Sequence, residues 1–274
     1  MCGRFSRSRT GVDYVEPLMT DDRYRRWSFD LGMFRRSWNI APGTRQVILK
    51  PDGARLEFWG YRPFWAVTRD VPMMINARLD KAQSSTWKRL FNAGRCLIPA
   101  DGWYEWVTER SRKQPYYIQP KASVPLYFAG LSSVATERRE TSSAPASGTV
   151  DGFVIVTDAA AGGMLDVHDR RPLVLNPEEA MAWLDPDTSF EEATHIANNA
   201  RTRATDFRWF RVTPQVNRSG VGNDDPSFSL PLERDDDSSN RASDGAHDKP
   251  RKHVADRRGD KAPDDREDGS DGSD

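Results

Sequence analysis

Short runs of apolar and β-branched residues, bounded by Pro, Gly, Asn or Asp, recur between residues 46 and 157. Runs of this length between turn-forming residues are typical of β-strands, whereas a helix needs a longer pattern with the helical period. The sequence therefore predicts strands over residues 46–49, 56–60, 95–99, 102–108, 115–119, 126–131 and 153–157.

Helical patterns are fewer. Asn176-Pro177 followed by two glutamates is a strong helix start, because Asn caps free backbone N–H groups and Pro fits the first turn. It predicts a helix that continues to Leu184. Weaker patterns predict three further helices, over residues 12–19 (shortened by Pro17), 82–92 and 189–199.

Grouped strands with helices placed irregularly among them are typical of the α+β class. We therefore predict a single α+β domain over residues 1–232. Its core is expected to be a curved, largely antiparallel, barrel-like β-sheet flanked by helices. Residues 136–152, which are rich in Ser, Ala and Gly, predict a long surface loop within this domain.

The composition changes at residue 233. Residues 233–274 contain no Phe, Trp or Tyr and consist mainly of Asp, Arg, Ser, Gly and Lys, which predicts a disordered, charged tail. This tail holds 14 acidic and 9 basic residues, so residues 1–232 hold 31 basic and 27 acidic ones. The folded part is therefore mildly basic, which fits an anionic partner without requiring one.

Several classes of protein are disfavoured by what the chain lacks. No stretch approaches the roughly eighteen apolar residues of a membrane span, and the first residues lack the apolar core of a secretory signal. The two cysteines make no disulfide framework, and Cys96, in an apolar run, is expected to be buried and inert in a cytoplasmic protein. The four histidines show no metal-ligand spacing. We expect a monomer with no metal and no cofactor.

Cys2 is a candidate reactive residue, because removal of Met1 would leave its α-amine and its thiol on adjacent carbon atoms. Such a 1,2-aminothiol condenses with an aldehyde: the amine forms an imine, and the thiol closes on it to give a five-membered thiazolidine. The amine has an ordinary pKa of about 8, so part of it is neutral and nucleophilic at cellular pH. The alternative, that Cys2 is an incidental residue of a frayed terminus, stays open on these residues alone.

Three further segments hold more chemically useful side chains than a core requires. Asn76 and Arg78 share one face if their segment is extended. Glu105 stands among aromatic residues, an environment that raises the pKa of a carboxylate by desolvation. His168 precedes an acid and two arginines. Each residue also has an ordinary structural role open to it, in a turn, a surface ion pair or a loop.

Together with Cys2, these segments resemble one known family, the SRAP proteins, which are abasic-site processing proteins also called SOS response-associated peptidases. The resemblance extends over residues 1–232 and leaves out the tail. The matching segments, in chain order, are Met1-Cys2-Gly3-Arg4-Phe5, Trp38-Asn39-Ile40-Ala41-Pro42-Gly43, Trp59-Gly60-Tyr61, Asn76-Ala77-Arg78, Arg95-Cys96-Leu97-Ile98-Pro99-Ala100-Asp101-Gly102-Trp103-Tyr104-Glu105-Trp106 and His168-Asp169-Arg170-Arg171-Pro172.

The resemblance implies that the N-terminal cysteine captures the open aldehyde of an abasic site in single-stranded DNA and shields the lesion from cleavage. Carried over by motif, Cys2 is the nucleophile and Glu105 is the acid/base that moves protons between amine, carbinolamine and imine. His168 corresponds to the histidine that helps to open the sugar and serves reversal or β-elimination of the 3′ phosphate. Asn76 corresponds to the amide that orients the open sugar and the Cys2 end.

The implied activities are DNA–protein crosslinking, an associated lyase activity and a peptidase activity that removes Met1, although ordinary methionine removal would also suffice. Arg4, Arg78 and Arg170 correspond to positions along the strand path, where guanidinium groups hold phosphates. The further expected DNA contacts are Pro42 and Trp65, as wedge or stacking surfaces for bases, and Thr157.

Two positions depart from the family pattern. Ala66 follows Trp65 where relatives carry a second aromatic residue, and Asp80 stands where the usual motif Asn-Ala-Arg-x-Glu has a glutamate. We expect Asp80 to be structural. Trp59 lies at a strand end, so we expect it in the core rather than against DNA bases.

Two other functions are considered beside the resemblance. Several glutamine amidotransferases with an N-terminal nucleophile also begin Met-Cys-Gly, but their Arg-Gly-Pro-Asp type of stretch is absent here. The second alternative is a non-covalent single-stranded DNA-binding module in which Cys2 is incidental. A denaturing gel with an abasic oligonucleotide, beside an assay for ammonia release from glutamine, separates these functions.

Overall fold

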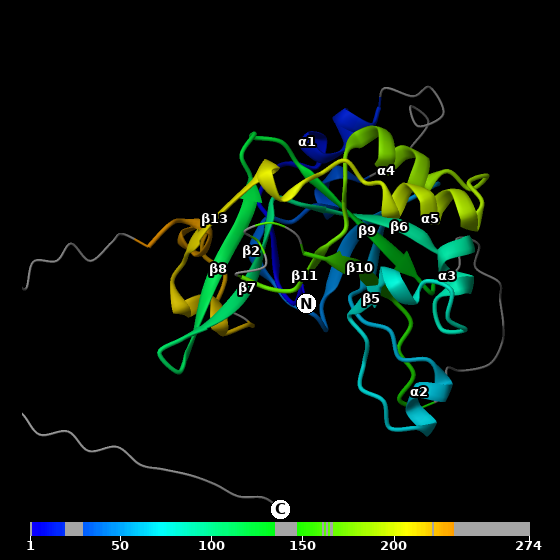
Figure 1. The fold of residues 1–274 in the computed structure, drawn as a ribbon, viewed down its shortest axis with the longest axis horizontal. Helices are drawn as coiled ribbons and strands as arrows, with labels where there is room; N and C mark the ends of the chain where they lie inside the picture. The colour runs from blue at the N-terminus through cyan, green and yellow to red at the C-terminus, as the bar shows by residue number, and fades with distance from the viewer. Residues whose placement is uncertain are drawn as a thin grey trace, which may run out of the picture. The chain divides into compact units, whose positions relative to one another are not determined.

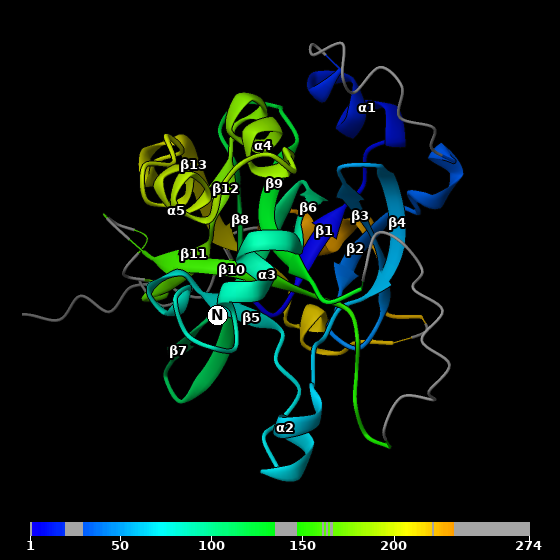
Figure 2. The same ribbon diagram turned by 90° about the vertical axis from the view of Figure 1, so that its right-hand side faces the viewer.

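The computed structural model describes residues 2–19, 30–134, 147–160, 162, 164, 167–220 and 222–232. These residues form two β-sheets and a group of helices that lies beside the larger sheet (Figures 1 and 2). They belong to one unit of the chain, Met1–Glu233. The predicted tail, residues 233–274, and most of the predicted loop at 136–152 lie outside the described residues.

The smaller sheet has five strands, which are antiparallel throughout. In spatial order they are β13 (Phe207–Arg211), β8 (Arg112–Pro120), β7 (Gly102–Glu109), β1 (Phe5–Arg7) and β2 (Ser37–Ile40). Its two end strands come from distant parts of the sequence, and the N-terminal strand is held between β7 and β2.

The larger sheet has eight strands. Six follow one another in the order β11 (Arg170–Pro172), β10 (Phe153–Ala159), β9 (Leu126–Ser132), β6 (Arg95–Ala100), β3 (Arg45–Lys50) and β4 (Gly53–Phe58). Two short strands pair beside this path: β12 (Val174–Leu175) with β9 in antiparallel and β5 (Asn76–Arg78) with β10 in parallel.

The helices are short. The α-helices are α1 (Gly11–Val15), α2 (Phe64–Thr68), α3 (Lys88–Ala93), α4 (Pro177–Leu184) and α5 (Phe190–Asn198). The 3₁₀ helices are η1 (Glu16–Leu18), η2 (Leu31–Met33), η3 (Leu79–Lys81), η5 (Ala204–Asp206), η6 (Pro214–Asn217) and η7 (Pro226–Ser229). None of the described helices is long and apolar enough to cross a lipid bilayer.

The central strands of the larger sheet are apolar on both faces because a layer covers each face. In β10, Val154 and Val156 belong to the cluster under the helices, whereas Phe153 and Ile155 belong to the cluster shared with the five-stranded sheet. Leu97 and Ile98 of β6 divide in the same way. The alternation of side chains along a strand thus explains why these runs are apolar at every position.

The predicted α+β class is confirmed, and so are the seven predicted strands, which correspond to β3, β4 and β6–β10. The helix from Asn176 is confirmed as α4, with the Asn176 side chain accepting from the Glu179 N–H, and the helix expected at 189–199 is confirmed as α5. The helix predicted at 12–19 is divided, because the segment with Pro17 continues as 3₁₀ helix η1. The helix expected at 82–92 is reduced to α3.

The prediction of a single barrel-like sheet is wrong, because the structure has two sheets and neither closes into a barrel. The physical reason lies in the apolar runs of β6, β9 and β10, whose two faces both require cover. The smaller sheet supplies that cover on one face and the helices supply it on the other. Three strands that the pattern did not predict, β1, β2 and β13, form both ends of the smaller sheet and its junction with β7.

Candidate active site

The N-terminal residues reach the site because β1 runs antiparallel to β7. Phe5 pairs with Trp103 and Ser6 with Gly102, and the ladder continues as the Tyr104 N–H donates to the Arg4 carbonyl. This register leads the chain before Arg4 alongside the residue after Tyr104. Glu105 therefore lies beside the start of the chain.

A second set of candidate residues is assembled around β10. Thr157 of β10 pairs with Arg78 of β5 on one side and with Pro172 of β11 on the other, and Ile155 pairs with Asn76. The short strands β5 and β11 thus bring the segments of Asn76 and His168 to one strand. β5, β10, β11 and β7 lie near one another in both views (Figures 1 and 2).

Cys2 joins these two groups. Its side chain has no exposed surface, and its thiol donates to the Arg4 carbonyl with a sulfur-to-oxygen distance of 3.9 Å. The Asn76 amide Nδ2 donates to the Cys2 carbonyl at 3.0 Å. Burial raises the pKa of the Cys2 thiol, and the nearby Glu105 carboxylate raises it further. The thiol is therefore protonated at neutral pH and needs a base to react.

One side-chain atom of Asn76 is able to accept a further hydrogen bond. While Nδ2 is bonded to the Cys2 carbonyl, Oδ1 is buried and has no hydrogen-bond partner in the described structure. A buried polar atom without a partner costs free energy, so such atoms are uncommon and merit an explanation. A ligand hydroxyl would satisfy it.

Glu105 is an acid whose environment brings its pKa close to neutrality. Its side chain is 3% exposed, and burial raises its pKa to about 7, with Asp169 acting in the same direction. The positive charge of the N-terminal amine acts in the opposite direction. Near pH 7 the carboxyl is therefore present in both forms, which suits a group that accepts and donates protons in turn.

One ring nitrogen of His168, Nδ1, lies close to both a hydrogen-bond donor and an acceptor. Its Nδ1 is 3.0 Å from the Arg170 backbone N–H and 2.8 Å from Asp169 Oδ1. The side chain is 31% exposed, and burial lowers its pKa, with the N-terminal amine acting in the same direction and Asp169 opposing it. The imidazole is therefore neutral at pH 7 and able to accept a proton.

The arginines predicted along the strand path are divided between two settings. Arg78 is exposed and forms a forked pair with Asp80, with Nε–Oδ1 at 3.0 Å and Nη2–Oδ2 at 2.6 Å. Arg170 is largely buried, donates to the Thr157 carbonyl at 2.8 Å and lies 3.6 Å from Oδ1 of the same Asp80 carboxylate. Asp80, whose pKa its hydrogen bond with Arg78 lowers to about 2, thus holds both guanidinium groups in place. This agrees with the structural role expected for it.

Arg4 is held by the protein itself. Its guanidinium donates to Asn39 Oδ1 at 2.5 Å and to the Val216 carbonyl of η6 at 2.7 Å. These bonds fasten η6 to the start of β1. The phosphate contact predicted for Arg4 stays a prediction, and so do the contacts predicted for Arg78, Thr157 and Arg170.

The two predicted base-contacting residues lie outside this cluster. Pro42 is in the turn between β2 and β3, next to Gly43, whose φ of +82° suits glycine. Trp65 is half-buried on α2, with the Arg69 guanidinium 5.9 Å from its ring, and α2 projects from the body of the domain (Figures 1 and 2). Trp59 is fully buried and stacks on Phe153, so its predicted place in the core is confirmed.

Sequence reasoning missed the residue that anchors the far end of β1. Asp101 accepts hydrogen bonds from the Ser8 N–H and hydroxyl, from Arg9 Nε at 2.8 Å and from the Tyr14 hydroxyl at 2.9 Å. It thereby fixes the chain just after β1, the strand that follows Cys2. The signal in the sequence was weak, because Asp before Gly ordinarily marks a turn.

No three His, Cys, Asp or Glu side chains in the described ranges are grouped so that they could hold a metal ion. The cluster of Cys2, Asn76, Glu105 and His168 instead offers a thiol, an amide, a carboxyl with a pKa near neutrality and a neutral imidazole. This combination suits covalent capture of an electrophilic carbon with proton transfer.

The chain matches the family model for SOS response associated peptidase (SRAP) over residues 1–219, so it belongs to the SRAP family, as its sequence motifs predict. It is 39% identical over 221 residues to the abasic site processing protein YedK of Escherichia coli (strain K12), covering 79% of this chain and 94% of that relative.

Two solved structures are similar. A phage-related protein from Bordetella bronchiseptica has a TM-score of 0.62 and 36% identity, covering 84% of this chain and 99% of that chain. A protein from Bacteroides thetaiotaomicron has a TM-score of 0.64, covering 84% of this chain and 100% of that chain. At 21% identity, this second likeness concerns the fold alone.

Proposed function

We propose that this chain captures abasic sites in single-stranded DNA by forming a covalent thiazolidine between Cys2 and the aldehyde of the open sugar. The observation that carries the proposal is the junction at Cys2, where Asn76 is bonded to the Cys2 backbone and the Glu105 carboxyl acts on the pKa of its thiol. The family relatives named abasic site processing proteins support it.

The reaction begins once Met1 is removed and the Cys2 α-amine is free. The amine adds to the aldehyde carbon to give a carbinolamine, which loses water and leaves an imine. The thiol sulfur then bonds to the imine carbon, its proton passes to a base, and the nitrogen takes up a proton. The product is a neutral thiazolidine, and the sum of the steps releases one water molecule.

Glu105 is the proton carrier in these steps. As a carboxylic acid it protonates the hydroxyl that leaves the carbinolamine, and as a carboxylate it takes the proton of the Cys2 thiol. Both forms are available because the pKa of this carboxyl is about 7. Burial of the site keeps bulk water from hydrolysing the imine before the thiol closes on it.

Asn76 and His168 act on the sugar. The unpartnered Asn76 Oδ1 accepts a hydrogen bond from a hydroxyl of the open sugar, which holds the aldehyde carbon near the amine. Neutral His168 takes the proton of the sugar hydroxyl as the ring opens. The same imidazole can remove a proton next to the imine, so that the 3′ phosphate leaves by β-elimination, which is the associated lyase activity.

The DNA strand is held mainly by its phosphates. Arg78 and Arg170, whose positions Asp80 fixes, are expected to hold phosphates on the β10 side of the site, beside Thr157. Pro42 and Trp65 are expected to meet bases. Removal of Met1, by self-cleavage or by an aminopeptidase, completes the proposed activity because it exposes the amine.

The proposal is tested by mixing the protein with a single-stranded oligonucleotide that carries one abasic site and running a denaturing gel. We expect a shifted band with the wild-type chain and none with Cys2→Ala. Ammonia release from glutamine without a shifted band would instead identify an amidohydrolase. Binding on a native gel with neither signal would identify a non-covalent DNA-binding module.

A further inference from the structure

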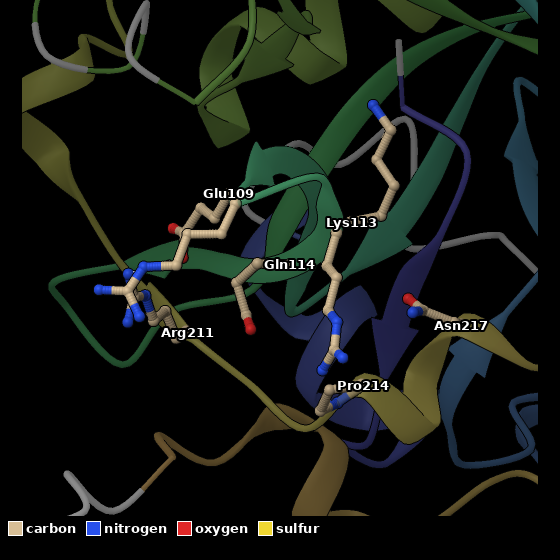
Figure 3. A pocket seen from close by; sticks show the side chains of 8 residues that line it. Glu109, Lys113, Gln114, Arg211, Pro214 and Asn217 are labelled. Carbon is tan, nitrogen blue, oxygen red and sulfur yellow. The ribbon is translucent and has the colours of Figure 1, made fainter.

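A cavity of about 740 Å³ lies at the end of the β7–β8 hairpin, and no residue of the predicted site lines it. We call it the hairpin pocket. It is lined by Glu109, Arg110, Arg112, Lys113, Gln114, Arg211, Pro214 and Asn217 (Figure 3). These residues come from the hairpin, from the last residue of β13 and from η6. Half of them are cationic.

The charge of the hairpin pocket is largely unbalanced. Its acidic residue, Glu109, lies 2.6 Å from Arg211 and accepts a hydrogen bond from the Tyr116 hydroxyl at 2.7 Å. Figure 3 shows the Arg211 and Glu109 side chains beside each other, whereas Lys113 extends away from them. Within the described part of the chain, the exposed side chains of Arg110, Arg112 and Lys113 take part in no hydrogen bond or ion pair. Three positive charges are therefore available to a ligand.

The hairpin turn has an arginine at a position where Asn or Gly would be less strained. Glu109 pairs with Arg112, so the turn has two central residues, Arg110 and Ser111, with φ of +44° and +67°. Turns of this kind strongly favour Asn and Gly, because the left-handed region costs other residues about 1–2 kcal/mol each. A strained turn that presents a basic side chain is the kind of feature that points to a binding role.

The hairpin pocket adjoins the candidate active site. Glu105 lies four residues before Glu109 on β7, which corresponds to about 13 Å along a strand. The positive charge of Lys113 also helps to lower the pKa of His168, so the two residues are electrostatically coupled. A chain of phosphates that passes Glu105 and His168 thus meets the hairpin cations next.

We propose that the hairpin pocket binds the phosphates of the single DNA strand where that strand continues beyond the active site. The inference rests on the proposed function only for the identity of the strand. Guanidinium and ammonium groups on an exposed turn suit phosphates, and release of the counterions of the strand favours their binding. An acidic protein partner would account for the positive charges but not for their position. The strand explains in addition why they adjoin the residues that act on the sugar.

The test compares two triple variants that remove the same charge. The first is Arg110→Asn/Arg112→Gln/Lys113→Gln, in which Asn tolerates the left-handed turn. The matched control is Arg35→Gln/Arg36→Gln/Lys121→Gln, whose three cations are also exposed and make no side-chain hydrogen bond or ion pair in the described structure. Circular dichroism melts verify that both variants are folded.

Affinity is measured for undamaged single-stranded oligonucleotides of about 15 nucleotides over a range of salt concentrations. Each phosphate contact contributes about 0.7 to the slope of log affinity against log salt, so three lost contacts should reduce the slope by about 2. With this change in slope, the ratio of wild-type to variant affinity should grow by about 100-fold for each tenfold reduction in salt concentration. The control should reduce the slope by well under 1.

Equal changes in the two variants, or an unchanged slope in the hairpin variant, would overturn the inference. The covalent adduct with an abasic oligonucleotide is scored separately on the wild-type chain. Absence of that adduct beside a clear hairpin effect would refute the thiazolidine and leave the phosphate contacts standing. An adduct with no hairpin effect would support the thiazolidine and refute the phosphate contacts of the hairpin pocket.

Discussion

The two cysteines of this chain are equally buried, but the groups around them differ. Neither Cys2 nor Cys96 has exposed surface, and burial raises the pKa of both thiols. Each also lies near a buried glutamate, Glu105 for Cys2 and Glu57 for Cys96, which raises its thiol pKa further. The direction of the thiol pKa shift therefore does not distinguish the two residues.

The difference lies in the partners of the two neighbouring glutamates. Glu57 is committed to a buried cluster, where it lies 3.4 Å from Lys50 and accepts a hydrogen bond from the Ser132 hydroxyl at 2.6 Å. Glu105 has a pKa of about 7 and interacts with the N-terminal α-amine, which acts to lower that pKa. In the proposed mechanism, reactivity at Cys2 depends on the amine and on a proton that Glu105 can transfer, and an activated thiolate is not required.

The largest effect is expected when each of the two cysteines is replaced in turn. Cys2→Ala should abolish the adduct with an abasic oligonucleotide, whereas Cys96→Ala should keep it, because Cys96 only fills space between the sheets. Denaturing gels measure both. An adduct that survives Cys2→Ala, or that disappears in a folded Cys96→Ala protein, would break the comparison.

A smaller but still large effect is expected in the rate of adduct formation. Glu105→Gln should slow it by about 100- to 10,000-fold, the usual contribution of a general acid or base. Non-covalent DNA affinity should hardly change, because the role proposed for Glu105 is proton transfer and not the binding of a phosphate. Glu57→Gln is the matched control and should leave the rate unchanged in the folded protein. An equal fall in rate and affinity would make Glu105 a structural residue.

The same two variants should change stability in opposite directions. Because the pKa of Glu105 is raised from about 4.5 to about 7 in the folded state, its ionisation destabilises the fold progressively between these pH values. Glu105→Gln should therefore raise the free energy of unfolding at pH 8 by on the order of 3 kcal/mol and change it little at pH 4.5.

Glu57→Gln should lower the free energy of unfolding by about 3–5 kcal/mol, because it leaves the Lys50 charge buried and unpaired. Urea titrations at the two pH values measure both effects. A Glu105→Gln protein that is less stable than wild type at pH 8 would contradict the raised pKa of Glu105.

The smallest effect is expected from the amide that holds the Cys2 backbone. Asn76→Ala removes one hydrogen bond worth about 1 kcal/mol and a sugar contact of similar size, so adduct formation should slow by about 5- to 30-fold. Ser132→Ala, in the cluster beside Cys96, should lower stability and leave the adduct rate unchanged. Single-turnover gels at saturating DNA distinguish the two.

Local patterns in the sequence predicted much of this molecule. The strands β6, β9 and β10 follow from apolar runs, α4 follows from its Asn-Pro cap, and the raised pKa of Glu105 follows from its aromatic neighbours. The family motifs also point to Cys2 rather than Cys96 as the reactive cysteine.

Long-range relations could not be predicted from those patterns. A run that is apolar at every position does not say whether one curved sheet or two stacked sheets covers it, and β1 is too short to show a period. Asp101 acts by fixing Ser8, Arg9 and Tyr14, which lie far from it in the sequence, and the residues around Asp101 give no sign of that. The hairpin pocket combines residues from β7, β8, β13 and η6, which only the fold brings together.

The central claim is that the amine and the thiol of Cys2 act together, and it is tested most directly by controlling the amine alone. The chain is prepared with a removable leader, and the protein is assayed before and after a protease trims it to begin at Cys2. Both forms carry the same thiol. We predict a stable adduct, of the mass of protein plus abasic oligonucleotide minus one water, with the trimmed form and none with the untrimmed form. An equal adduct from the untrimmed form would contradict the thiazolidine.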